Sequence, residues 1–247
     1  MTSIIGIYCK DGVVIGADSA TTFGNGRIPT IEQPSEKIEV IADKILVAGT
    51  GEVGLNQRFC NQIKIAYESK LFKDSEIECC RNISRNALID FEQTGIKIPN
   101  INYGALVAFP IHDKHYLCEF GINTIQPELK TKKIWYVSMG CTQGITDPFL
   151  AFIREIFWEN ELPNINEAIF AIYWTIDHAI KVNPGGVNGP ISIAILEKSN
   201  GSFSPRKLTD EDLFEHIQNI EDAKKALKDY KTFQQSKTAV IPKVPQR

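Results

Sequence analysis

Short apolar runs separated by two-residue turns occupy the first fifth of the chain. Residues 3–9 and 13–18 flank an Asp-Gly turn, and residues 37–41 and 44–48 repeat the arrangement around Ala-Asp. Runs joined in this way predict antiparallel hairpins, so the chain is not expected to open with a parallel β-α-β unit. Residues 19–36 are polar and contain glycine and proline, which predicts a loop or an irregular edge.

Two helices are predicted next, because apolar residues recur three and four positions apart in residues 52–70 and 75–93. Ser75 and Glu78 have the spacing of a capping box, in which the serine side chain accepts a hydrogen bond from a free backbone N–H. The second helix is therefore expected to begin at Ser75.

Strands and helices alternate again in the second half of the chain. Residues 103–110 and 115–120 predict a third hairpin, and residues 134–139 predict a further strand. A helix is expected to start at residue 146, where an acidic cap precedes a proline in the first turn. Apolar residues at helical spacing predict another helix over residues 164–181.

The end of the chain adds two strands and a last helix. Residues 191–196 and Phe203 flank a Ser-Asn-Gly turn, and residues 209–230 carry an apolar stripe with acidic residues in the first turn. Hairpins and helix pairs in this order predict an α+β fold, with two antiparallel sheets packed together between helix pairs. We expect one domain over residues 2–205 and a C-terminal helix and tail extension over residues 206–247.

Composition excludes several classes of protein. The chain has 247 residues, 43% of them hydrophobic, and a formal net charge of −3. This balance is unsuited to general nucleic-acid binding, since neutralising phosphates needs a basic surface. No apolar run approaches the ~20 residues that span a bilayer, and residues 1–6 lack the basic and apolar regions of a signal peptide. We therefore expect a cytoplasmic protein with no membrane or nucleic-acid partner.

Metal and disulfide chemistry find no support in the sequence. Six cysteines occur, none in a C-x-x-C pair: Cys9, Cys60, Cys79, Cys80, Cys118 and Cys141. Their spacing fits neither a zinc site nor a disulfide framework, so reduced and mostly buried thiols are expected. His112 and His115 flank a predicted turn and are expected to lie in solvent without further ligands. The sequence predicts no metal and no cofactor.

Two glycine motifs suggest alternative chemistries. Residues 49–54 match G-x-G-x-x-G, but the preceding strand belongs to a hairpin rather than to a dinucleotide-binding unit. A flexible turn, or backbone N–H groups that stabilise an oxyanion, are the other interpretations. Residues 140–144 have the spacing of a nucleophile elbow with Thr142 as the nucleophile, against the simpler interpretation of a glycine-rich loop.

Thr2 offers a different nucleophile. It follows Met1, and a small second residue permits removal of the initiator methionine. The product would hold a hydroxyl and an α-amine on one residue. An amine with a pKa of ~7.7–8.0 is partly neutral near pH 7 and can accept the hydroxyl proton. Nucleophile and base would then share one residue, although the Met-Thr sequence alone does not distinguish Thr2 from an ordinary terminus.

Four segments around Thr2 strengthen this hypothesis: Thr2–Ile7, Lys10–Ser19, Glu36–Ile38 and Asp43–Gly49. Together they resemble the proteasome β subunits and their bacterial HslV-type relatives, which are N-terminal nucleophile (Ntn) hydrolases. The resemblance is strong over residues 2–60 and extends in layout to about residue 205. It implies a four-layer αββα sandwich, which the order of predicted elements also favours.

The resemblance implies a role for each matching residue. Thr2 would attack the scissile carbonyl, Lys37 as an ammonium would favour its alkoxide, and Asp18 would hold Lys37 charged and oriented. The Gly49 N–H would face the oxyanion. Thr22 would contact the substrate backbone.

Other positions depart from the family or only hint at specificity. Val47 lies where the family lines its first specificity pocket, and it favours an apolar substrate side chain. Cys141 replaces a serine that supports the nucleophile in the family, and a thiol is a weaker donor. The family's Asp-x-x-Ser pair has no counterpart in residues 183–190, where Asn183 or Asn188 could supply a polar group instead.

The function implied is peptide-bond hydrolysis through an acyl ester on Thr2, inside a homo-oligomeric ring. Unfolded proteins or peptides would be the substrates, and an AAA+ ATPase unfoldase is a candidate partner. A non-catalytic ring or scaffold subunit and a small-molecule amidase are the alternatives. The peptidase hypothesis requires Thr2 to lie close to Lys37 and on the same sheet.

Overall fold

The computed structural model describes residues 2–25, 28–73, 75–158, 161–183, 185–199 and 201–238. The chain divides into two compact units, Met1–Leu208 and Thr209–Arg247. In the described part, no helix is both long enough and apolar enough to cross a membrane.

Two five-stranded antiparallel sheets form the centre of the first unit. The first sheet has the order β10-β1-β2-β11-β12, with bounds Tyr136–Gly140, Ser3–Tyr8, Gly12–Ala17, Ser192–Ser199 and Ser202–Lys207. The second sheet has the order β5-β6-β7-β8-β9, with bounds Ile38–Ile41, Ile45–Gly51, Tyr103–Ile111, Lys114–Phe120 and Pro127–Leu129. Each predicted hairpin is therefore confirmed.

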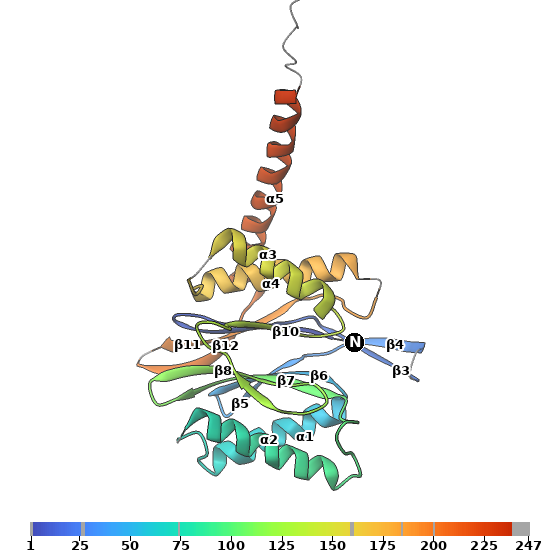
Figure 1. Ribbon diagram of the computed structural model, residues 1–247, viewed down its shortest axis with the longest axis vertical. Coiled ribbons are helices and arrows are strands. Elements are labelled where there is room, and N and C mark those ends of the chain that lie inside the picture. The colour runs from blue at the N-terminus through green and yellow to red at the C-terminus, as the bar shows by residue number, and fades with distance from the viewer. Residues whose placement is uncertain are drawn as a thin grey trace, which may run out of the picture. The chain divides into compact units, whose positions relative to one another are not determined.

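A pair of helices covers the outer face of each sheet (Figure 1). Helices α1 (Val53–Glu68) and α2 (Glu76–Glu92) pack on the second sheet, and α3 (Gln143–Phe157) and α4 (Ile165–Val182) pack on the first. The first unit is thus a four-layer αββα sandwich, as the sequence predicts.

Apolar cores lie between these layers, and two of them involve the second sheet. Between the sheets, strand residues from both sides interdigitate, among them Ile4, Ile15, Leu46, Leu106 and Leu196. A second core lies between the second sheet and helices α1 and α2, and its largest side chains are aromatic. Burying each such side chain fully contributes roughly 1.5–3 kcal/mol, so the two cores together fix which faces of the strands point inward.

Of the two alternatives predicted for residues 19–36, a loop or an irregular edge, the loop is wrong. These residues form a separate two-stranded antiparallel sheet of β3 (Ala20–Asn25) and β4 (Ile28–Pro34). The described side chains Phe23 and Ile31 are exposed. The pair is held by backbone hydrogen bonds, and the described residues of β4, 31–34, are exposed, so this part of the strand carries no alternation of buried and exposed positions.

The predicted start of the second helix at Ser75 is confirmed, but its predicted capping box does not form, and the predicted start of the third helix is wrong. Ser75 lies at the N-cap of α2 but its side chain makes no capping hydrogen bond, and Glu78 pairs with Arg81 instead. Helix α3 begins at Gln143 rather than at residue 146, because Asp147 accepts a hydrogen bond from the Ser138 hydroxyl and does not cap the helix.

A capping box forms at the start of α4, where none is predicted from the sequence. Asn164 accepts from the Glu167 N–H at 2.9 Å, and the Glu167 carboxylate accepts from the Asn164 N–H at 2.7 Å. These two bonds satisfy donors that the first turn of a helix otherwise leaves free. They define the N-terminus of α4.

The second unit contains helix α5, Asp210–Thr238. Thr209 and Asp212 cap its start reciprocally, with the Asp212 N–H donating to Thr209 Oγ1 at 3.3 Å and the Thr209 N–H donating to Asp212 Oδ2 at 2.8 Å. The helix runs eight residues beyond the predicted end at residue 230, into the segment expected to be a loose tail. The remainder of that segment lies outside the described residues.

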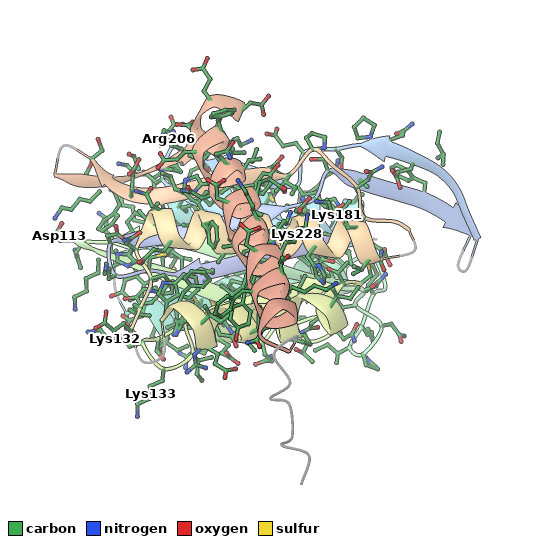
Figure 2. The ribbon with its side chains drawn as sticks, turned by 90° about the horizontal axis from the view of Figure 1, so that it is seen from above. Asp113, Lys132, Lys133, Lys181, Arg206 and Lys228 are labelled. Carbon is green, nitrogen blue, oxygen red and sulfur yellow. The ribbon has the colours of Figure 1, made fainter. Side chains whose placement is uncertain are left out.

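Charged side chains on the first unit come from separate elements. Figure 2 labels Lys132 and Lys133 in the exposed segment between β9 and β10, Lys181 at the end of α4 and Arg206 on β12. Two of these cations are paired, Lys181 with Asp177 and Arg206 with Glu197.

The close packing of α4 on β2 depends on Gly16. A Cβ atom there would lie 2.2 Å from Ile172 Cγ2, inside the buried interface. Replacing Gly16 by Ala is expected to lower the free energy of unfolding by about 1–3 kcal/mol through overpacking. Gly54 in α1 has no atom within 4 Å of the same position, so Gly54→Ala is the control and should stabilise by roughly 0.5–1 kcal/mol. Urea unfolding measures the transition midpoint of each variant, and equal shifts of the midpoint in Gly16→Ala and Gly54→Ala would contradict the packing argument.

Candidate active site

The candidate site is organised by Asp18, a fully buried carboxylate directly after β2. Its Oδ1 atom accepts from Lys37 Nζ at 2.6 Å and from the Ser3 N–H at 2.8 Å. Its Oδ2 atom accepts from the Ala20 N–H at 3.0 Å and, at the longer distance of 3.4 Å, from the Asn188 N–H. A buried carboxylate is stable when such donors replace water, so all four are held around one point.

Lys37 reaches Asp18 from the other sheet. It precedes β5 of the second sheet, whereas Asp18 follows β2 of the first, so their ion pair joins the two layers. Burial lowers the pKa of Lys37, and the nearby Asp18, Cys141 and Glu32 oppose that effect. Burial therefore disfavours the ammonium form of Lys37, and the Asp18 carboxylate favours it.

Thr2 lies directly before β1 and is 9% exposed. Its carbonyl accepts from the Cys141 N–H at 2.9 Å, and the Cys141 thiol donates to the same oxygen at 3.5 Å. Gly140 adopts φ +106°, and a Cβ atom there would lie 2.0 Å from this carbonyl. The end of β10 therefore fixes the backbone of Thr2, and only glycine at residue 140 permits the approach.

Thr2 and Lys37 meet at Asp18 although they belong to different sheets. The Ser3 N–H and the Lys37 ammonium bind the same oxygen, Asp18 Oδ1. The ammonium therefore lies next to the peptide that joins Thr2 to Ser3. The requirement that Thr2 and Lys37 share a sheet is not met, because β1 and β5 belong to different sheets. The facing sheets instead bring Lys37 to the Thr2–Ser3 peptide across the inter-sheet space, so the proximity that the hypothesis needs does not depend on a shared sheet.

Thr142 lies behind the candidate nucleophile and contacts the first residue of β1 through its side chain. Its side chain is fully buried, and its hydroxyl donates to Ser3 Oγ at 2.7 Å. One turn later Thr146 donates to Ser138 Oγ at 2.8 Å. The residues of the elbow-like motif thus connect β1 and β10 to the start of α3, and they do not present Thr142 to solvent.

The other expected residues lie along β6 and β3. Val47 is 1% exposed and belongs to the core between the second sheet and helices α1 and α2. Gly49 lies on the same face of β6, where a Cβ atom would be 2.0 Å from Asn56 Oδ1. Thr22 is part of β3, and its side chain lies outside the described residues.

Asn188, rather than Asn183, joins the site. Its carbonyl accepts from the Ser19 N–H at 3.0 Å, and its side-chain amide donates to Glu32 Oε1 at 3.2 Å. Asn183 instead donates to the Gly185 carbonyl, away from Asp18.

Ser3 and Ser19 were not singled out from the sequence, and no local pattern marks them as functional. The Ser19 hydroxyl donates to the Pro190 carbonyl at 2.5 Å, and the two residues are 171 positions apart along the chain. Only the folded chain brings such distant partners together.

Cysteines and histidines supply no metal site among the described residues. All six cysteines are free, and five are buried while Cys141 is exposed. His112 is exposed as expected, but His115 is not: its Nε2 donates to the Cys9 carbonyl at 3.0 Å, and its ring packs on Tyr8 and Phe203. Burial lowers the pKa of His115.

A groove of about 640 Å³ elsewhere on the first unit takes no part in this site. It is lined by α2 and by residues 96–101 with Gln126 and Pro127. None of the residues expected to be functional lines it.

The Asp18–Lys37 pair predicts a large stability effect. Asp18→Asn leaves a buried ammonium without its anion, so the free energy of unfolding should fall by about 3–5 kcal/mol. The matched control is Asp90→Asn, because the Arg58–Asp90 pair is partly exposed and should contribute about 1 kcal/mol or less. Urea titration measures both, and equal losses would contradict the importance of the buried pair.

Comparisons with known proteins agree with this arrangement. Residues 1–99 match the family described as "Proteasome subunit". A proteasome subunit beta of Nanoarchaeum equitans is 30% identical over 134 residues, which are 51% of this chain and 59% of that protein. Proteasome subunit beta 1 of Thermococcus onnurineus is 30% identical over 91 residues, 35% of this chain and 43% of that protein. The chain thus matches about half the length of these relatives.

A solved structure extends the likeness to the whole fold. The structure of the Anbu (Gly-1) mutant from Hyphomicrobium sp. strain MC1 superposes on this chain with a TM-score of 0.67. The match covers all of both chains, and the two sequences are 14% identical. At that identity the likeness concerns the fold alone, which is the proteasome-like Ntn-hydrolase fold. Residues 1–99 therefore match the proteasome-subunit family, and the resemblance of this chain to the proteasome β subunits is confirmed.

Proposed function

We propose that this chain is a threonine peptidase whose nucleophile is Thr2 after removal of Met1. The observation that carries the proposal is the buried Asp18–Lys37 ion pair, which shares its carboxylate oxygen with the Ser3 N–H. A positive charge is thereby held beside the residue whose hydroxyl would have to become an alkoxide. Nothing comparable surrounds Thr142, whose hydroxyl is buried and donates to Ser3.

The reaction proceeds in two steps that share one acyl ester. The Thr2 hydroxyl oxygen attacks the scissile carbonyl carbon while its proton passes to the freed α-amine. The resulting ammonium returns the proton to the leaving nitrogen as the C–N bond breaks, which leaves the acyl group esterified to Thr2. Water then attacks the ester through the same amine, and the carboxylic acid departs as the threonine hydroxyl is restored.

The neighbouring groups have supporting roles in the proposal. The Lys37 ammonium lowers the energy of negative charge on the Thr2 oxygen, and Asp18 keeps Lys37 charged and oriented. The Gly49 N–H is assigned to the oxyanion, and Thr22 to the substrate backbone. The Cys141 N–H donates to the Thr2 carbonyl. The backbone of Cys141 therefore positions Thr2, although the Cys141 thiol is a weak donor.

Assembly into a homo-oligomeric ring belongs to the same proposal. Enclosure in a ring restricts access to unfolded proteins and peptides, and an AAA+ ATPase unfoldase is the candidate partner that would deliver them. The match to proteasome subunits supports ring assembly. A cytoplasmic location follows from the same proposal.

A non-catalytic ring or scaffold subunit is the second candidate function. The observation that favours it is the loss of the supporting serine, since at residue 141 a thiol contacts the Thr2 carbonyl at 3.5 Å. In that case Met1 would be retained, because an intact terminus leaves no free α-amine on Thr2. A small-molecule amidase would use the same processed Thr2 and differ only in substrate.

The mass of the purified chain tests the nucleophile. We expect the loss of one methionine residue, and a single adduct on Thr2 after incubation with an epoxyketone or a β-lactone. Thr2→Ala should abolish the adduct and lower kcat/KM for peptide hydrolysis at least ~1,000-fold, as loss of a nucleophile does. Retained Met1 without an adduct would overturn the proposal in favour of the scaffold.

Thr94→Ala is the matched control, because Thr94 is exposed near the end of α2 and contacts Arg58. It should leave both the adduct and the turnover unchanged. An adduct located on Thr142 by fragmentation would show that the elbow, not the terminus, supplies the nucleophile.

The pH dependence of turnover tests the roles of the two amines. The rate of acylation should rise with pH as the α-amine, with an ordinary pKa of ~7.7–8.0, loses its proton. It should fall again as pH passes through the pKa of Lys37, which burial places below the ordinary lysine value. A plot of kcat/KM against pH measures both limbs. An alkaline limb at or above the ordinary lysine pKa would contradict the role of the Lys37 ammonium.

A further inference from the structure

The groove of about 640 Å³ along α2 and residues 96–101 combines apolar walls with charged side chains. Ile77, Ile89 and Ile98 line it, and they are 47%, 52% and 52% exposed. Isolated apolar side chains are common on protein surfaces, whereas several that gather in one hollow mark a binding surface. We call this surface the α2 groove.

The charge of the α2 groove is positive. Besides the carboxylate of Glu92, its charged lining residues are the cations Arg81, Arg85 and Lys97. Arg81 is paired with Glu78, and Lys97 approaches Glu92 at 4.0 Å. Arg85 is exposed, and none of the described carboxylates lies within ion-pairing distance of it. The groove therefore offers guanidinium donors to an incoming carboxylate, directly beside apolar surface.

The first half of α5 has the complementary chemistry. Phe214 is 71% exposed, and Ile217, one helical turn later, is 38% exposed. Glu211 lies one turn before Phe214 and Glu215 lies next to it, and both carboxylates are exposed. None of the described lysines or arginines forms an ion pair with either of them. The exposed face of this half of α5 is thus both apolar and acidic.

The charges on the two helices have the same spacing. Arg81 and Arg85 are four residues apart on α2, and Glu211 and Glu215 are four residues apart on α5. Residues at this spacing share a helix face and lie about 6 Å apart along the axis. Two guanidinium groups can therefore bind two carboxylates at once, while Phe214 enters the groove as an apolar anchor.

We propose that the α2 groove of one copy of this chain binds the first half of α5 from a neighbouring copy. The inference names a contact for the ring assembly proposed above and rests on that part of the proposal. Because the two surfaces differ, each copy binds one neighbour through its groove and another through its helix. Such contacts build a ring when the rotation between neighbours closes, and a helical assembly when it does not.

Charge reversal on either surface tests the contact in the full-length chain. Arg81→Glu with Arg85→Glu makes the groove anionic, and Glu211→Arg with Glu215→Arg makes the helix cationic. Either variant alone places like charges against each other, so the protein concentration at which assembly is half complete should rise at least ~10-fold. Sedimentation velocity over a range of protein concentrations measures this midpoint.

Mixing the two variants separates a lost contact from a lost fold. The anionic groove of one variant then meets the cationic helix of the other, and the two unchanged surfaces also match, so the midpoint should return toward that of the unmodified chain. Variants that had failed to fold could not be rescued in this way. Lys132→Glu with Lys133→Glu, in the exposed segment between β9 and β10 (Figure 2), is the control, because it changes the net charge equally and should leave the midpoint unchanged.

The outcomes distinguish this contact from the function to which it belongs. An unchanged midpoint in the reversed variants, or no recovery on mixing, would overturn the contact and leave the peptidase and the ring in place. Recovery in one chain that carries all four substitutions, but not in the mixture, would place the contact within a single chain and also overturn the proposal. An unmodified chain that stays monomeric at every concentration would overturn the ring and this inference together, while the Thr2 adduct would still test the peptidase.

Discussion

The buried carboxylate of Asp18 is the constraint on which the rest of the site depends. It has no water to solvate it, so its charge must be balanced by the Lys37 ammonium and by backbone N–H groups. Those donors come from both sheets and from the segment after α4. This one buried carboxylate thereby ties the second sheet to the first beside the first residues of β1.

The four-layer sandwich makes this arrangement possible. Apolar residues on the inner faces of both sheets hold them together, and a helix pair covers each outer face. Gly16 lets α4 approach β2, and Gly140 lets β10 approach the carbonyl of Thr2. Neither approach leaves room for a Cβ atom, and the second one places the end of β10 against the backbone of the candidate nucleophile.

Polar chemistry is divided between the two faces of the second sheet. Lys37 reaches into the space between the sheets, where it meets the proposed nucleophile. Glu39, two residues later, lies with Asn56 and Tyr103 on the side of α1. Residues two positions apart on a strand share a face, but Lys37 lies before the first residue of β5 and its side chain reaches Asp18 of the other sheet.

The sequence by itself determined the elements whose signals are local. Turn dipeptides and apolar alternation predicted the hairpins and the helix pairs, and the motif around Thr2, Asp18 and Lys37 indicated the family. Only the tertiary structure decided that Asp18 and Lys37 meet across two sheets and that Asn188, 170 positions from Asp18, joins them. Hydrogen bonds between distant segments leave no periodicity in a sequence, because their geometry exists only after the layers have packed.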